Sequence, residues 1–185
     1  FVLFQNIIYY SNGIVYIGSN SNFAYALNAL NGRFRLHFKT HYPVFSAPVA
    51  KDGIVYFSNT NGQLYAVDGK ARSWPREHAV KPYWIQMWIW GLPLIPTPPP
   101  QSGYLWLFNL GRTATSSPVI VENTLYIGVD NKLVAVDLHS LQKSWEFETE
   151  SVLKSSPAVA DGFIYAANED GWLYALDTTN GEKLW

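Results

Sequence analysis

The sequence predicts an all-β protein built from about four similar units, and three observations support this fold class. A pattern of about forty residues recurs along the 185-residue chain. The apolar runs inside the pattern are short, rich in Val, Ile, Tyr and Phe, and lack the 3.6-residue spacing that marks a helix. Asn, Asp and Gly, which tolerate the backbone conformations of tight hairpins, separate the runs.

A weak copy of the repeat opens the chain. Residues 13–16 (GIVY) recur at 53–56, 40 positions later, which predicts a strand at each place. In this first copy Asn28 occupies the position of an aspartate that ends the apolar pattern in the later copies. Leu36 occupies the position of a tryptophan that follows the aspartate.

Three clear copies follow, and each begins at a Ser-x-Pro segment and ends at an aspartate. Each contains two expected strands separated by a polar turn. The strands lie at 54–57 and 64–68, at 124–127 and 133–137, and at 163–166 and 173–177. Asp68, Asp137 and Asp177 follow the prolines by 20, 19 and 20 positions. Proline at the start of a strand costs no important ladder hydrogen bond.

The four units run over 5–40, 45–77, 115–149 and 154–185. Several short antiparallel strands in each forty-residue unit are typical of a β-propeller blade. The sequence therefore predicts one propeller domain over 1–185, with about four blades of four antiparallel strands each. Four such blades are expected to form an incomplete ring, which missing blades of a longer chain or of another chain would complete.

The repeat resembles the PQQ-like β-propeller repeat, most fully over 155–185 and in variants at 116–145, 46–74 and 7–38. The resemblance implies that the tryptophan of the element Ala-x-Asp-x-x-x-Gly-x-x-x-Trp docks between neighbouring blades. A blade needs a neighbour on each face, and an indole buries a large apolar surface there. We interpret these residues as structural: Ala175, Asp177, Gly181 and Trp185 in the last unit, and Ala135, Asp137 and Trp145 in the unit before it.

The segment 78–112 interrupts the repeat. It contains an apolar stretch at 83–95, the sequence PTPPP at 96–100 and a second apolar stretch at 104–108. It also holds four of the eight tryptophans of the chain. Long insertions in compact domains are often functional, so this segment is the main candidate for a binding surface.

Three interpretations of the segment stay open. It forms a hairpin or loop that packs on its own propeller, or it is a docking surface for a protein partner, since aromatic residues and Met are enriched in interfaces. Alternatively, it makes a peripheral membrane contact through 83–108, because Trp favours the bilayer interface and the stretch is too short to span. The candidate partner-binding residues are Tyr83, Trp84, Trp88, Trp90, Tyr104 and Trp106.

The composition narrows the classes of function. Thirteen Lys and Arg against 14 Asp and Glu give a net charge of −1, which argues against a nucleic-acid partner. The absence of cysteine excludes disulfides, thiol catalysis and cysteine-ligated metal centres. No uninterrupted apolar run is long enough for an ordinary transmembrane helix.

No residue is assigned to catalysis, to a cofactor or to a metal. His37 and His41 can share one face of a strand, but a two-histidine metal site needs a third ligand, and none is evident nearby. The serines beside proline recur in every clear copy of the repeat. This repetition marks them as architectural, whereas a catalytic nucleophile would occur once.

The resemblance implies two classes of function. The first is a non-enzymatic scaffold for protein interaction without a cofactor, similar to BamB-type assembly factors or to extracytoplasmic sensor domains of bacterial kinases. A periplasmic or cell-surface location is expected for such propellers. The alternative is a fragment of a PQQ-dependent quinoprotein dehydrogenase, or of a multidomain enzyme that carries these repeats, which would bring PQQ and calcium. No residue of this sequence matches the catalytic residues implied for those dehydrogenases.

Overall fold

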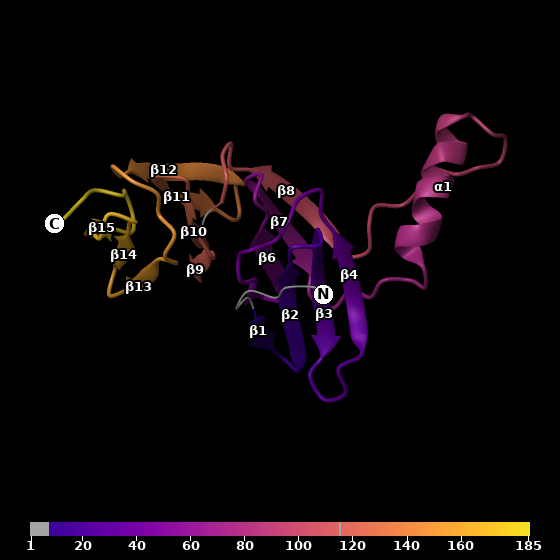
Figure 1. Ribbon diagram of the computed structural model, residues 1–185, viewed down its shortest axis with the longest axis horizontal. Helices are drawn as coiled ribbons and strands as arrows, with labels where there is room; N and C mark the ends of the chain where they lie inside the picture. The colour runs from indigo at the N-terminus through magenta and orange to yellow at the C-terminus, as the bar shows by residue number, and fades with distance from the viewer. Residues whose placement is uncertain (1–7, 115) are drawn as a thin grey trace.

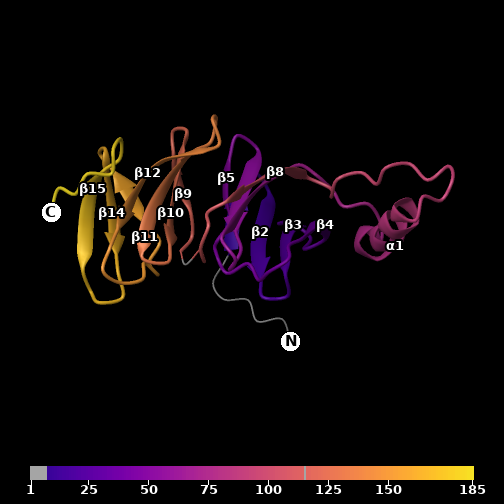
Figure 2. The same ribbon diagram turned by 90° about the horizontal axis from the view of Figure 1, so that it is seen from above.

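The protein is a row of four antiparallel sheets that stand side by side (Figures 1 and 2), and the all-β propeller fold predicted from the sequence is confirmed. The computed structural model describes residues 8–114 and 116–185. The expected starts of the first unit at residue 5 and of the third at residue 115 lie outside the described residues. Each sheet is one blade, and the blades follow one another in chain order.

Three of the blades each come from one unbroken stretch of chain. The first contains β1 (Ile8–Ser11), β2 (Ile14–Ser19), β3 (Phe23–Asn28) and β4 (Phe34–Lys39). The third contains β9 (Val119–Val121), β10 (Thr124–Val129), β11 (Lys132–Asp137) and β12 (Gln142–Glu148). The fourth contains β13 (Ala158–Ala160), β14 (Phe163–Ala167) and β15 (Leu173–Asp177).

The second blade is interrupted, and the boundary predicted for it is wrong. It contains β5 (Val49–Lys51), β6 (Ile54–Ser58) and β7 (Gln63–Asp68), and its fourth strand is β8 (Tyr104–Asn109), which pairs with β7. The helix α1 (Glu77–Ile89) lies between β7 and β8. The blade therefore extends beyond 45–77, and the insertion covers 69–103 rather than 78–112. Local spacing suggested that the blade ended at residue 77. Spacing alone cannot show which distant segment pairs with β7.

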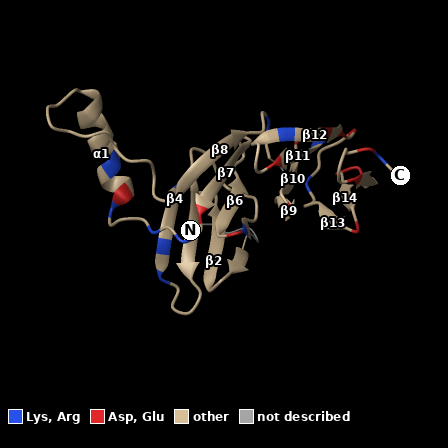
Figure 3. Cartoon of the chain, turned by 180° about the vertical axis from the view of Figure 1, so that it is seen from behind, with Lys and Arg blue, Asp and Glu red and all other residues tan. Residues whose placement is uncertain are grey.

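Within each blade, strands that are consecutive in the chain are neighbours in the sheet. The first strands, β1, β5, β9 and β13, lie next to one another in succession, so they form the inner side of the row. The last strands, β4, β8 and β12, form its outer side. Lys and Arg residues lie on β4 and β12 and in the turns (Figure 3).

The middle strands of the second and third blades bury both of their faces, which explains why they are continuous apolar runs instead of alternating patterns. In β6, Val55 and Phe57 pack toward the first blade, whereas Tyr56 between them packs toward the third. In β7, Val67 packs toward the first blade and Leu64 toward the third. A further apolar cluster joins the third and fourth blades. Each blade is therefore stabilised by its neighbours.

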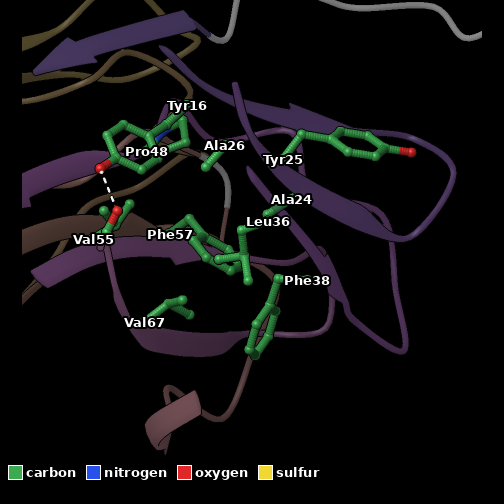
Figure 4. A pocket seen from close by; sticks show the side chains of 11 residues that line it. Tyr16, Ala24, Tyr25, Ala26, Leu36, Phe38, Pro48, Val55, Phe57 and Val67 are labelled. Atoms are coloured by element: carbon green, nitrogen blue, oxygen red, sulfur yellow. Dashed lines mark hydrogen bonds between the residues drawn. The ribbon is translucent and has the colours of Figure 1, made fainter. Parts of the chain in front are cut away.

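Apolar side chains fill the seam between the first and second blades (Figure 4). Phe38 of β4 meets Phe57 of β6 edge to face, with ring centroids 5.7 Å apart. The buried Tyr16 donates its hydroxyl hydrogen to the carbonyl of Gly69 at 3.1 Å, and burial raises the pKa of Tyr16. Gly69 is the first residue of the insertion, so this seam also fixes where the insertion leaves the second blade.

The serines of the Ser-x-Pro segments have the architectural role that their repetition predicts. The Ser46 hydroxyl donates to the Ser58 carbonyl at 3.0 Å and accepts the Ser58 N–H at 2.9 Å. Ser155 makes the same two contacts with Ala167, at 2.8 and 3.2 Å. Each of these serines therefore binds the end of the second strand of its own blade.

Candidate interaction surface

The insertion 69–103 covers the outer edge of the first blade. An exposed edge strand such as β4 invites pairing with other chains. The His37 N–H donates to Ser73 Oγ at 2.9 Å, and His78 Nε2 lies 2.6 Å from the His37 carbonyl oxygen. Further along the edge, the side-chain amide of Gln101 faces the backbone N–H and carbonyl of Lys39. The insertion thereby offers hydrogen-bond partners to the backbone groups of alternate residues of β4. These contacts hold the base of the insertion, the part next to the blades, against the first blade.

Glu77 joins the outgoing and returning parts of the insertion. Its side chain is 1% exposed, and Oε1 accepts the Ser102 N–H at 2.8 Å. Glu77 also lies in the first turn of α1, where the helix dipole favours negative charge. The helix therefore starts from a fixed position.

The stretch 83–95 does not form the hairpin that one of the three open interpretations included, because residues 77–89 are helical. The helix ends in a Schellman motif, in which Gly91 has φ 66° and donates its N–H to the Trp88 carbonyl at 3.0 Å. The Leu92 N–H bonds to the Met87 carbonyl at 3.2 Å. Gly91 and the following Pro93 are stop signals that the sequence did offer. Because the apolar residues do not form one stripe, no helical period revealed the helix.

The end of α1 and the loop after it form an exposed apolar surface, which we define as residues 83–96 and call the aromatic tip. No charged residue lies between Lys81 and Arg112. The tip projects away from the blades, on the side of the first blade (Figures 1 and 2). Its exposed large apolar residues are Tyr83, Ile85, Trp88, Ile89, Trp90, Leu92 and Leu94.

The loop after α1 folds back along the helix. The half-buried Trp84 donates its Nε1–H to the carbonyl of Pro96 at 2.9 Å. The tip therefore has a defined shape, in which one tryptophan binds the returning loop and the other aromatic residues remain free to contact another surface.

The structure separates the six predicted partner-binding residues into two groups. Four of them lie on α1 or at its end, namely Tyr83, Trp84, Trp88 and Trp90. Tyr104 and Trp106 lie instead on β8, the outer strand of the second blade. The residues of one predicted surface are therefore divided between the tip and a blade.

Trp106 occupies a blade-docking position. It lies opposite Ala66 in the β7–β8 pair, and the strand register shifts directly after Ala66. Trp145 lies opposite Ala135 with a register shift at the same place. The Trp106 ring is 5.8 Å from that of Tyr56, in the cluster between the second and third blades. We therefore reassign Trp106 from partner binding to the seam. The insertion hid this role by moving Trp106 away from its repeat.

Trp145 lies in the seam between the third and fourth blades. Its Nε1–H donates to the Thr178 carbonyl at 3.0 Å, and its ring centroid is 5.7 Å from that of Tyr126. The ring also packs over Gly181, where an added Cβ would come within 2.5 Å of a ring carbon. The Gly of the repeat element therefore makes room for the Trp of the preceding blade.

The last copy of the element is arranged in the same way within its blade. Residues 182–185 run beside β15, and the Ala175 N–H donates to the Trp185 carbonyl at 3.2 Å. The Trp185 ring lies 6.3 Å from that of Tyr165 and is 59% exposed. Trp185 thus has the strand position of Trp145 but is more exposed.

Asp137 and Asp177 shape the turns that follow them. Asp137 Oδ1 accepts the N–H groups of Ser140 at 2.6 Å and His139 at 2.9 Å. Asp177 Oδ1 accepts the Thr179 N–H at 2.7 Å. Hydrogen bonds from Ser140 lower the pKa of Asp137, and those from Thr179 lower the pKa of Asp177. Both carboxylates therefore act locally, as acceptors within their turns.

Two kinds of site are not found in the part of the chain that the structure describes. Within residues 8–114 and 116–185, no three or more His, Cys, Asp or Glu side chains are grouped so that they could hold a metal ion. Over the same residues, no helix has both the length and the apolar character needed to cross a membrane.

His37 makes the base of the insertion sensitive to pH. Burial, together with the nearby charge of His78, lowers the pKa of His37 below its usual 6.5. The folded protein therefore binds this proton more weakly than the unfolded chain does, so the free energy of unfolding should fall as the pH drops through 6.5 and below. Thermal unfolding measured across this range should depend less on pH in His37→Gln than in the wild type. Equal pH dependence in both proteins would contradict this assignment.

Comparison with known proteins agrees with this architecture. The sequence profile of the PQQ-like family described as outer membrane protein assembly factor BamB matches residues 4–80 and 90–185. The residues between the two matches, 81–89, lie within α1. The profile therefore covers the strands of the blades and leaves out most of the helix.

Individual relatives cover different shares of the chain. The outer membrane protein assembly factor BamB of Yersinia pestis is 28% identical in an alignment 192 residues long, which covers 95% of this chain and 41% of that protein. The serine/threonine-protein kinase AfsK of Streptomyces griseus is 32% identical in an alignment 92 residues long, which covers 43% of this chain and 11% of the kinase. This chain thus spans about two-fifths of the length of the Yersinia relative.

A solved structure shows the same fold. The quinohemoprotein alcohol dehydrogenase ADHIIG from Pseudomonas putida HK5 superposes with a TM-score of 0.68, over 96% of this chain and 33% of that chain. The two sequences are only 15% identical, so this likeness concerns the fold alone. Because the family profile covers nearly the whole chain, including all four blades, this chain belongs to the family of the outer membrane protein assembly factor BamB.

Proposed function

We propose that this chain is part of a non-enzymatic scaffold in outer membrane protein assembly, located in the periplasm, and that it docks through the aromatic tip. Membership of the BamB family supports the assembly role. The tip supports the docking role, because it is rigidly attached at its base by Glu77 and His78 and is free at its end.

One observation carries the docking role. A helix that is apolar around its circumference is ordinarily buried in a protein or a membrane. In α1 the outer half is apolar and exposed, with Tyr83 73% and Trp90 70% accessible to water. Large exposed apolar patches mark interaction sites. The surface that covers the tip must therefore come from outside the described residues.

The docking role is tested with the variant Tyr83→Ser/Trp88→Ser/Trp90→Ser in the full protein, produced in its own host. Loss of central aromatic residues typically weakens an interface by roughly a hundredfold or more. We expect the outer membrane protein content to fall to the level of the gene deletion, while the amount of scaffold protein and its Tm stay unchanged. Quantitative proteomics of isolated outer membranes measures the effect.

A matched control is Trp172→Ser, which removes a 62% exposed tryptophan from a turn of the fourth blade. It should leave the outer membrane protein content at the wild-type level. A tip variant that supports assembly as well as the wild type does would refute the docking role.

We also propose that the scaffold works without a cofactor. The alternative, a quinoprotein dehydrogenase, is supported by the shared fold and by a partial sequence similarity to the quinohemoprotein alcohol dehydrogenase of Comamonas testosteroni, which is 26% identical in an alignment that covers 45% of this chain. The two are distinguished by adding PQQ and calcium to the full protein and measuring dye reduction with an alcohol or an aldose. Turnover above the background measured without protein would refute the proposed scaffold role and support the dehydrogenase.

A further inference from the structure

We infer that the aromatic tip inserts into the surface of a phospholipid bilayer, with the lysines at the base of the insertion facing the lipid headgroups. This inference rests on the proposed docking role of the tip and names the surface to which it docks. Three features of the tip carry it: the distribution of apolar side chains, the length of the helix, and the position of the charges.

The distribution of apolar side chains around α1 favours a bilayer over a protein groove. At about 100° per residue, Trp88 and Ile89 point roughly 140° and 240° away from Tyr83 around the helix axis. All three side chains are exposed. A protein groove binds one face of an amphipathic helix. Lipid, by contrast, surrounds an inserted segment on every side, so a bilayer covers all three residues at once.

The loop at the end of the tip continues this surface. Leu94 is 100% exposed and Leu92 45% exposed. Leu94 also has φ 70°, a left-handed conformation that is unfavourable for a residue with a Cβ atom. The chain therefore holds an apolar side chain in water through an unfavourable backbone conformation.

The length of α1 limits how deep the tip can go. Its 13 residues extend only about 20 Å, whereas the hydrocarbon core of a bilayer is about 30 Å thick. Trp and Tyr favour the boundary between headgroups and acyl chains. The tip therefore fits a shallow insertion from one side, in which Tyr83, Trp88 and Trp90 lie at this boundary.

The position of the charges matches an anionic headgroup layer. The tip itself is uncharged, and the positive charge lies at its base (Figure 3). A hollow beside the base is lined by Lys39, Lys81, His41 and His78, and no acidic residue lines it. The nearby Glu77 is buried and does not line this hollow. Lysines next to an inserted apolar segment strengthen binding to anionic lipid.

The test is vesicle binding by the full protein. Mixed vesicles of phosphatidylethanolamine and phosphatidylglycerol should sediment the wild type, and brominated lipid should quench part of its tryptophan fluorescence. The variant Tyr83→Ser/Trp88→Ser/Trp90→Ser should partition at least about tenfold more weakly. The control Trp172→Ser should bind as the wild type does. In Lys39→Gln/Lys81→Gln, binding to these vesicles should fall severalfold, toward the level measured with phosphatidylcholine alone.

Absence of vesicle binding by the wild type would overturn the inference, and so would equal binding by the tip variant. If the tip variant loses assembly in cells although the wild type binds no vesicle, the tip docks onto a protein and the proposed function stands. If the wild type binds vesicles through the tip although assembly is unaffected by the tip variant, the membrane contact stands and the proposed docking function fails.

Discussion

Replacing Trp145 by alanine is expected to lower the free energy of unfolding by about 3 kcal/mol, near the lower end of the range for large-to-small core changes because the side chain is only half-buried. The loss has two sources. The indole fills the seam against Tyr126 and over Gly181, and its N–H satisfies the Thr178 carbonyl. For a chain of this length the Tm should fall by about 6–12 °C.

Thermal and urea unfolding, followed by circular dichroism, measure this loss. Trp172→Ala removes an exposed indole and should change the free energy of unfolding by less than about 0.5 kcal/mol. Trp106→Ala should also lower the free energy of unfolding, because Trp106 has the same strand position in the neighbouring seam and packs against Tyr56. A Trp106→Ala protein with wild-type stability would show that the reassignment of Trp106 to the seam is wrong.

Replacing Gly62 by alanine is expected to lower the free energy of unfolding by more than about 3 kcal/mol, through a backbone clash added to backbone strain. The added Cβ would overlap the carbonyl oxygen of Arg112, which belongs to the chain leading to the third blade. Gly62 also has φ 72°, and its carbonyl accepts the Leu110 N–H at 2.7 Å. The substitution therefore forces apart the turn of the second blade and the chain that leaves β8.

Gly13→Ala is the matched control for this prediction. Gly13 has a similar φ of 76°, but an added Cβ would meet nothing within 4 Å. It should cost only the left-handed strain, about 1–2 kcal/mol. The difference between the two variants measures the clash. Equal losses of stability in urea unfolding would mean that the turn moves away from Arg112 at little cost.

These stability predictions concern residues that the docking experiments leave untouched. The stability variants change residues within the blades, namely Trp145, Trp106 and Gly62. The docking variant changes exposed residues of the aromatic tip, namely Tyr83, Trp88 and Trp90, which only another surface could bury. Substitutions in the blades should therefore change Tm, and substitutions in the tip should change binding at constant Tm. This separation allows a folding defect to be told apart from a docking defect.

The blades that come from unbroken stretches of chain could be predicted from the amino-acid sequence. Their strands pair with chain neighbours across tight turns, so the information lies within a few residues, as in the turn at Asn59–Gly62. The recurrence of the serines and of the element ending at Trp145 favours a structural interpretation for the same reason. Repetition itself distinguishes an architectural residue from a catalytic one.

The outer strand of the second blade, the role of Trp106 and the shape of the insertion became visible only in the folded protein. β8 pairs with β7 across 35 inserted residues, 69–103. Closing a longer loop costs only a little more entropy, so the two strands can pair across such an insertion. The spacing of residues near β7 therefore does not reveal the pairing. The base of the insertion is fixed by the bonds of His37 to Ser73 and His78, which are 36 and 41 positions away. α1 lacks an apolar stripe because no blade covers it, and a helix without a covered face leaves no periodic signal in the sequence.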